Sequence, residues 1–145
     1  MKKKLNCILL IDDDEPTNFI SEMLIEEANC AEHIQIAQTG QTALNYLTNS
    51  ERLGAEMDSF PSPNLIFLDI NMPAMDGWEF LAHYKRLKNE QKAKVIIIML
   101  TTSLNPDDRE KASKIKEISG FETKPLTPEL IERVMTKYFK AEVPV

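Results

Sequence analysis

The chain has 145 residues, of which 43% are hydrophobic and 28% charged, as is typical of one globular domain. Its formal net charge of -6 argues against a nucleic-acid-binding protein, because such proteins hold phosphate backbones with clustered Lys and Arg. Two cysteines are too few for a disulfide framework or a zinc site, and no apolar run approaches the roughly 18 residues of a membrane span, so we expect a cytoplasmic protein.

Strand-like and helix-like patterns alternate five times along the chain. The segments predicted to be strands are 7–11, 33–37, 65–68, 95–100 and 121–123. Each is followed by apolar residues at helical spacing, namely Phe19, Ile20, Met23 and Leu24; Ala43, Leu44 and Leu47; Phe80, Leu81, Tyr84 and Leu87; Ala112, Ile115 and Ile118; and Leu130, Ile131, Val134, Met135 and Tyr138.

Two helix starts are explicit in the sequence. Thr127 is the expected N-cap of the last helix, with Pro128 at its first position. Pro106, followed by two aspartates, opens the fourth helix, whose dipole favours acids there. Residues 49–64 are predicted to be a long mobile surface loop, broken by Gly54 and two prolines.

The strand compositions predict the order of the strands in a parallel sheet. Segments 7–11, 65–68 and 95–100 are continuously apolar, as strands buried on both faces are. Segment 33–37 alternates and 121–123 is short and polar, so both suit sheet edges. We therefore predict an α/β fold of the doubly wound, flavodoxin-like type, with strand order 2-1-3-4-5 and helices on both faces.

Charged side chains follow three of these strands at their carboxyl ends. Asp12, Asp13 and Asp14 follow the first strand, Asp69 the third and Lys124 the fifth. Two carboxylates about 5 Å apart repel by about 3 kcal/mol at an effective dielectric near 20, and a single lysine offsets only part of this. Mg²⁺, which prefers carboxylate and carbonyl oxygens, is the expected counter-ion, although Asp13 or Asp14 could instead cap the first helix.

A carboxylate beside a divalent cation can act as a nucleophile toward phosphorus. Thr101, at the end of the fourth strand, could place a hydroxyl on the same rim and bind phosphate, or it could be an ordinary strand-terminal threonine.

The chain contains four short motifs in this order: Ile11-Asp12-Asp13; Leu68-Asp69-Ile70-Asn71-Met72-Pro73 with Asp76-Gly77; Leu100-Thr101; and Thr123-Lys124-Pro125. Together they resemble the receiver domains of two-component response regulators, of the stand-alone, chemotaxis-regulator-like type. The resemblance covers a core of about 6–139 and implies that 1–145 is one receiver domain without an output domain.

The resemblance implies that Asp69 accepts a phosphoryl group from a phosphohistidine on a histidine kinase or a phosphotransfer protein. Such a protein would catalyse only its own phosphorylation and autodephosphorylation. It would then relay the phosphoryl group or bind an unidentified target protein through a phosphorylation-dependent face formed by the fourth helix, the fifth strand and the fifth helix. Formation of a weak dimer is an open possibility, and neither nucleic acid nor a membrane is expected as a partner.

The resemblance also assigns roles to the residues around Asp69. Asp13 and Asp69 would bind Mg²⁺ directly, Asp12 mainly through water, and Asn71 through its backbone carbonyl. Lys124 would pair with a phosphate oxygen.

The same resemblance implies a switch. Thr101 would move toward the phosphate, and Phe121 would rotate inward to fill the space it leaves, a change read out by packing because Phe121 has no hydroxyl. The bond before Pro125 would be cis. The positions expected to tune the lifetime of the aspartyl phosphate are Asn71, Thr102 and Ser103.

Two alternatives compete with this interpretation. A Mg²⁺-dependent phosphohydrolase of the haloacid dehalogenase type needs an acid two residues after its nucleophile, where this chain has Asn71. A receiver-fold docking scaffold that no longer accepts phosphate is the other alternative, although all four motifs are intact.

Overall fold

The computed structural model describes residues 4–53, 61–87, 95–102 and 105–139. Its elements in chain order are β1 (Leu5–Ile11), α1 (Glu15–Ala28), β2 (Ala31–Ala37), α2 (Gly40–Leu53), β3 (Leu65–Asp69), α3 (Gly77–Tyr84), β4 (Ile96–Thr101), α4 (Pro106–Ser113), β5 (Gly120–Thr123) and α5 (Pro128–Phe139). In these described parts of the chain, every helix is too short or too polar to cross a lipid bilayer.

The five strands form one parallel sheet in the order β2-β1-β3-β4-β5, which confirms the predicted topology. The registers align the carboxyl ends of the strands. Ile11 lies beside Leu68, and Thr101 lies beside Thr123. The residues that follow β1, β3, β4 and β5 therefore emerge along one edge of the sheet.

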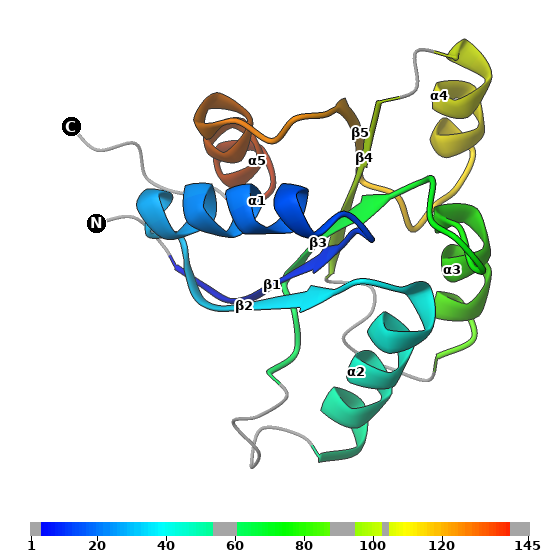
Figure 1. Cartoon of the computed structure of the whole chain (residues 1–145), viewed down its shortest axis with the longest axis horizontal. Helices are drawn as coiled ribbons and strands as arrows, with labels where there is room; N and C mark the ends of the chain where they lie inside the picture. Colours follow the sequence, from blue (N-terminus) through cyan, green and yellow to red (C-terminus); the bar gives the residue numbers. More distant parts are fainter. Residues whose placement is uncertain (1–3, 54–60, 88–94, 103–104, 140–145) are drawn as a thin grey trace.

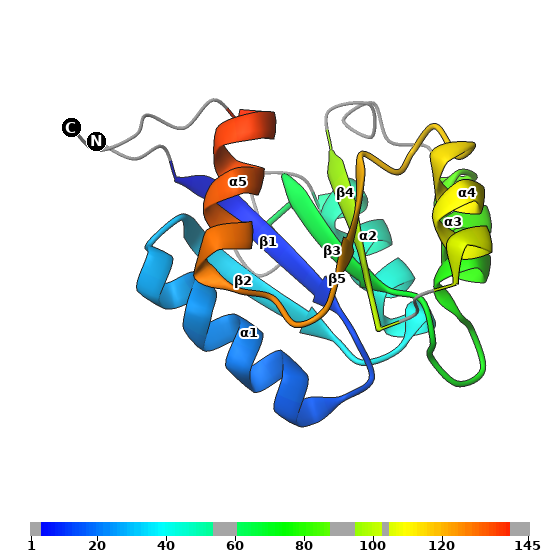
Figure 2. The same cartoon turned by 90° about the horizontal axis from the view of Figure 1, so that it is seen from above.

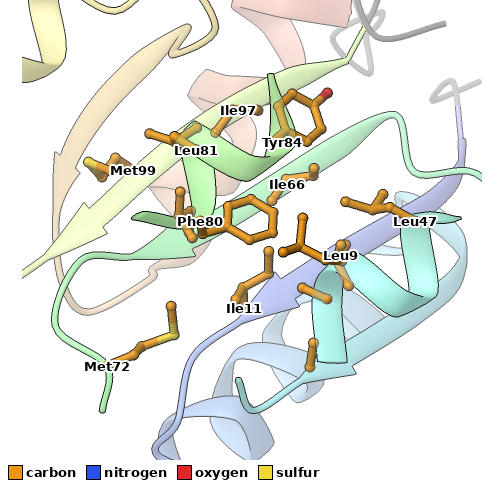
Figure 3. Close-up of a cluster of buried hydrophobic side chains, with 14 of the residues drawn as sticks. Leu9, Ile11, Leu47, Ile66, Met72, Phe80, Leu81, Tyr84, Ile97 and Met99 are labelled. Carbon is orange, nitrogen blue, oxygen red and sulfur yellow. The ribbon is translucent and has the colours of Figure 1, made fainter. Parts of the chain in front are cut away.

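Helices cover both faces of the sheet, with α1 and α5 on one face and α2, α3 and α4 on the other (Figures 1 and 2). Figure 3 shows the core under α2 and α3, where Phe80 and Leu81 meet strand residues such as Ile66. Phe80 is fully buried, and a buried side chain of this size contributes about 2–3 kcal/mol. This packing fixes α3, and with it the loop that follows Asp69.

Three helix ends differ from the predictions. Helix α3 ends at Tyr84, one turn before Leu87, the last residue of its predicted apolar pattern. The loop predicted at 49–64 is wrong in its first part, because α2 continues to Leu53 and no glycine or proline interrupts it before Gly54; residues 54–60 lie outside the described chain. The fourth helix is shorter than its apolar spacing predicts. It ends at Ser113, and tighter three-residue bonds, such as Ile115 N–H to Ala112 O at 3.1 Å, follow it.

Helix α1 buries two polar side chains and exposes three large apolar ones. Asn18 and Ser21 are buried, whereas Phe19, Ile20 and Met23 are 65%, 51% and 41% exposed. The apolar spacing correctly predicts a helix but does not identify its buried face. Large exposed apolar side chains gathered on one helix are typical of a docking surface.

Helix α4 buries few of its side chains, and two of its exposed side chains make cation–π contacts. Of its eight residues, only Ala112 is buried. The Arg109 guanidinium lies 5.0 Å from the centre of the Phe121 ring on β5, and the Lys111 ammonium lies 4.5 Å from the centre of the Trp78 ring on α3. Cation–π contacts at such sites contribute about 0.5–1 kcal/mol each.

Candidate functional site

Three carboxylates meet at the carboxyl edge of the sheet. Asp12 and Asp13 follow β1 and Asp69 ends β3, and one carboxylate oxygen from each lies within 4.8 Å of the others. Asp12 and Asp69 are each 7% exposed, whereas Asp13 is open to solvent. The structure therefore brings together the acidic residues that the sequence predicted would converge.

Lys124 bridges the two buried carboxylates. Its ammonium lies 2.5 Å from Asp12 Oδ2 and 3.2 Å from Asp69 Oδ1. Burial alone would lower the pKa of Lys124, but the hydrogen bond that its ammonium donates to Asp12 and the charge of Asp69 outweigh burial and raise the pKa above 10.5. The lysine is therefore a permanent cation in this pocket.

The charges of the pocket do not balance. Burial, followed by the neighbouring Asp12 carboxylate, raises the pKa of Asp69 above its ordinary value of 3.8, and Lys124 only partly opposes this rise. Three carboxylates face one ammonium, so the site attracts a further cation.

Four hydrogen bonds hold Asp12 in place. Its N–H donates to Ala37 O at 3.1 Å, and its carbonyl accepts from Asn18 Nδ2 at 2.8 Å. Its carboxylate accepts from the Asp14 N–H at 2.9 Å and from Lys124. Asp12 is thus oriented by β2, by α1 and by β5 together.

Asp14 has a different task from its two neighbours. It is the N-cap of α1, accepting from the Thr17 N–H at 3.0 Å and from the Thr17 hydroxyl, and these bonds lower its pKa. Of the two residues that could have capped this helix, Asp14 is therefore the cap, and Asp13 belongs to the carboxylate cluster.

Thr101 and Lys124 are joined through the backbone, because the Lys124 N–H donates to Thr101 O at 2.8 Å. Thr101 is fully buried, and the peptide bond from Lys124 to Pro125 is cis. Phe121 is partly buried in β5, beside Met99 of β4. These positions place the proposed switch pair on adjacent strands at the site's edge.

Two of the three expected tuning positions lie in the described chain, Asn71 after β3 and Thr102 after β4. Asn71 and Thr102 have exposed side chains, and Ser103 lies outside the described residues. The expected roles of all three, including Asn71 as a carbonyl ligand, stay predictions.

The loop after Asp69 returns very close to its own strand. The Gly77 N–H donates to Ile70 O at 2.7 Å, and a Cβ on Gly77 would lie 2.6 Å from Asp69 O. Only glycine fits at this approach. Asp76 and Glu79 then cap α3 reciprocally, with the Glu79 N–H at 2.8 Å from Asp76 Oδ1.

Ala74, at the tip of the same loop, has a φ of 67°. This left-handed conformation costs an L-residue about 1–2 kcal/mol. It accompanies a tight turn in which the Met75 N–H donates to Pro73 O at 2.7 Å. The loop beside Asp69 is thus held in a strained conformation.

The donor set fits Mg²⁺. Three carboxylate oxygens within 4.8 Å are hard ligands of the kind this ion takes, and the excess of negative charge favours it. Asp12, Asp13 and Asp69 could hold such an ion, with Lys124 left to meet an anion.

The sequence missed one residue of this site. Asn18 was hidden because the apolar pattern pointed to Phe19 and Ile20 as the helix stripe. The signal was present, since positions 18, 21 and 25 also share one helix face, but their polar members did not suggest burial.

Comparisons with known proteins agree on one family. The model of the response regulator receiver domain matches residues 8–136. Response regulator Rcp1 from Synechocystis sp. is 32% identical over 101 residues, covering 70% of this chain and 65% of Rcp1. The probable methanogenesis regulatory protein FilR2 from Methanothrix harundinacea is 28% identical over 128 residues, covering 88% of this chain and 77% of FilR2.

A solved structure gives the same result in three dimensions. The crystal structure of a two-component response regulator from Cytophaga hutchinsonii has a TM-score of 0.82 and 32% identity with this chain. The superposition covers 95% of this chain and 99% of that one.

Proposed function

Because the chain belongs to the response regulator receiver family, we propose that Asp69 accepts a phosphoryl group in a Mg²⁺-dependent reaction. The donor is a phosphohistidine on a histidine kinase or a phosphotransfer protein. The observation that carries this proposal is the meeting of three carboxylates with a single bridging lysine.

The residues of the pocket divide the work. An oxygen of the Asp69 carboxylate attacks phosphorus, the P–N bond of the donor breaks, and its electron pair returns to the imidazole. Asp12, Asp13, Asp69 and the Asn71 carbonyl hold Mg²⁺, which when bound lessens the repulsion between these carboxylates and the phosphoryl oxygens. Lys124 offers its ammonium to a phosphoryl oxygen.

The donor docks on the exposed apolar face of α1. This helix begins at Asp14, directly after the carboxylates, so its exposed Phe19, Ile20 and Met23 lie on the element next to the pocket. A donor that covers them brings its phosphohistidine toward Asp69. The partner surface is therefore apolar, which suits contact with another protein.

Phosphorylation is read out through Phe121. Its ring makes a cation–π contact with Arg109 of α4. When Thr101 turns toward the phosphate and the ring moves inward, Arg109 loses this contact. The changed face then binds a target protein, or the phosphoryl group passes along a relay. Both steps take place in a reducing cytoplasm, where Cys7 and Cys30 stay reduced as thiols.

Acetyl phosphate tests the chemistry directly. With Mg²⁺, the intact mass should rise by one phosphoryl group, hydroxylamine should remove it, and EDTA should prevent it. Asp69→Asn should abolish the adduct, whereas Asp107→Asn, an exposed aspartate of α4, should not. An unmodified parent protein would favour the docking scaffold, and continuous phosphate release from general phosphoesters would favour a phosphohydrolase.

The donor surface is tested separately. Phe19→Ser with Ile20→Ser should slow phosphorylation by the donor protein and leave phosphorylation by acetyl phosphate unchanged, because the small donor needs no docking. Equal loss with both donors would place the defect in the pocket instead.

A further inference from the structure

Asn18 is a buried amide that contacts the acidic pocket only through the backbone. Its side chain is 3% exposed, and its Nδ2 donates to the carbonyl oxygen of Asp12 at 2.8 Å. A carbonyl oxygen can only accept, so the amide nitrogen must be the donor.

The bonded carbonyl belongs to the peptide unit that joins Asp12 to Asp13. A peptide unit is planar, so fixing its oxygen also fixes the direction in which the chain leaves for Asp13. The Asp12 N–H is already tied to Ala37 O at 3.1 Å. With both bonds in place, the backbone of Asp12 is held on both sides, and the chain leaves toward Asp13 in a fixed direction.

Core packing does not account for an asparagine at this position. Asn18 shares the buried face of α1 with Ser21 and Ile25, where an apolar side chain would bury more surface. A buried amide costs about 1–3 kcal/mol unless it is hydrogen-bonded. The side-chain amide of Asn18 donates its hydrogen bond to the turn that carries the carboxylates.

We propose that Asn18 is a positioning residue for the magnesium site, which holds the Asp12–Asp13 peptide so that both carboxylates face one cation. This inference rests on the proposed function, because it assumes that the cluster binds Mg²⁺. Outer residues that orient metal ligands typically change metal affinity by about 10- to 100-fold.

The test compares Asn18→Leu and Asn18→Ala with Ser21→Ala. Both changes at Asn18 remove the donor, one filling the space and the other leaving it empty, so one folded variant suffices. Ser21→Ala alters a buried polar residue one turn further along the same face. Binding of Mn²⁺ is followed by the electron paramagnetic resonance signal of the free ion, with Mg²⁺ as competitor.

We expect Asn18→Leu and Asn18→Ala to bind Mn²⁺ and Mg²⁺ about tenfold more weakly, and Ser21→Ala to bind like the parent. The Mg²⁺ concentration that gives half-maximal phosphorylation by acetyl phosphate should rise by the same factor, while the rate at saturating Mg²⁺ stays near the parent's. In metal-free urea unfolding, Asn18→Leu should be as stable as the parent or more so.

A folded Asn18 variant with parental metal affinity would overturn the inference while leaving the proposed function intact. So would a Ser21→Ala variant that binds metal as weakly as the Asn18 variants do. A loss of stability without a change in metal affinity would also overturn it, since Asn18 would then serve the core. If the parent protein binds no Mn²⁺ in a manner sensitive to Asp13→Asn, both the inference and the proposed function fail.

Discussion

Replacing Asp69 by Asn should stabilise the metal-free protein, although it removes the proposed phospho-acceptor. The raised pKa of Asp69 means that the folded protein holds this carboxylate in its ionised form at a cost. Asparagine keeps the shape of the side chain and removes the charge.

The distances give the size of the effect. At an effective dielectric near 20, two carboxylate oxygens at 4.8 Å, the upper limit of their separation here, repel by about 3.5 kcal/mol, and Asp69 faces two such neighbours. The attraction to Lys124 at 3.2 Å is worth about 5 kcal/mol. Removing two repulsions and one attraction leaves a gain of about 2 kcal/mol, which for a chain of this size corresponds to roughly 6 °C in Tm.

Urea unfolding in EDTA and in Mg²⁺ measures this gain. At ten times its Kd, Mg²⁺ should stabilise the parent by about 1.4 kcal/mol and Asp69→Asn by less, so the difference between the two should narrow. Asp107→Asn removes the same charge from the first turn of α4, where the helix dipole favours it, and should destabilise slightly.

The pH dependence has a definite sign. Because the pKa of Asp69 is raised on folding, its cost is fully present above the folded pKa and disappears below the ordinary value of 3.8. The extra free energy of unfolding of Asp69→Asn over the parent should therefore disappear as the pH falls from the folded pKa of Asp69 to below 3.8. Equal or lower stability of Asp69→Asn in EDTA at neutral pH would refute the reasoning, as would a difference that Mg²⁺ leaves unchanged.

Three further predictions concern other parts of the molecule. Ala74→Gly should raise the free energy of unfolding by about 0.5–1 kcal/mol, since glycine relieves the φ of 67° at some entropic cost; a lower urea midpoint would contradict this. Thr102→Ala should shorten the lifetime of the aspartyl phosphate, measured by loss of the phosphoryl mass, because the smaller side chain opens the path for water; an equal or longer lifetime would count against it. The Cys7 thiol is fully buried, and burial raises its pKa to about 11. A disulfide reagent at pH 8 should therefore label it only as fast as the protein unfolds. A labelling rate that does not change with urea concentration would contradict this prediction.

The sequence predicted the sheet because strand burial follows directly from local composition. Continuous apolar runs identified the central strands, and the polar segment ending at Thr123 identified an edge. The start of α5 was also predicted correctly, because the Leu130 N–H donates to Thr127 Oγ1 at 3.1 Å, as the expected N-cap requires. Such features depend on residues that are neighbours in the chain.

The convergence of the acidic residues was also predictable, because parallel strands end at a common edge. What could not be predicted depends on contacts between distant elements. The buried face of α1 includes Asn18, whose hydrogen bond to Asp12 an apolar pattern does not reveal. The length of α4 is likewise decided by turns that pack Ile115 and Ile118 against the core outside a helix.

The slight anchoring of α4 has a consequence for signalling in the opposite direction. Ala112 is the one buried residue of this helix, and the cation–π contacts of Arg109 and Lys111 add about 0.5–1 kcal/mol each, so a modest binding event supplies free energy of the same order. Thermodynamic coupling between two sites is reciprocal. A target protein that binds the displaced helix must therefore stabilise the phosphorylated state by the same factor by which phosphorylation strengthens its binding. The bound target thus shifts the phosphorylation equilibrium toward the aspartyl phosphate.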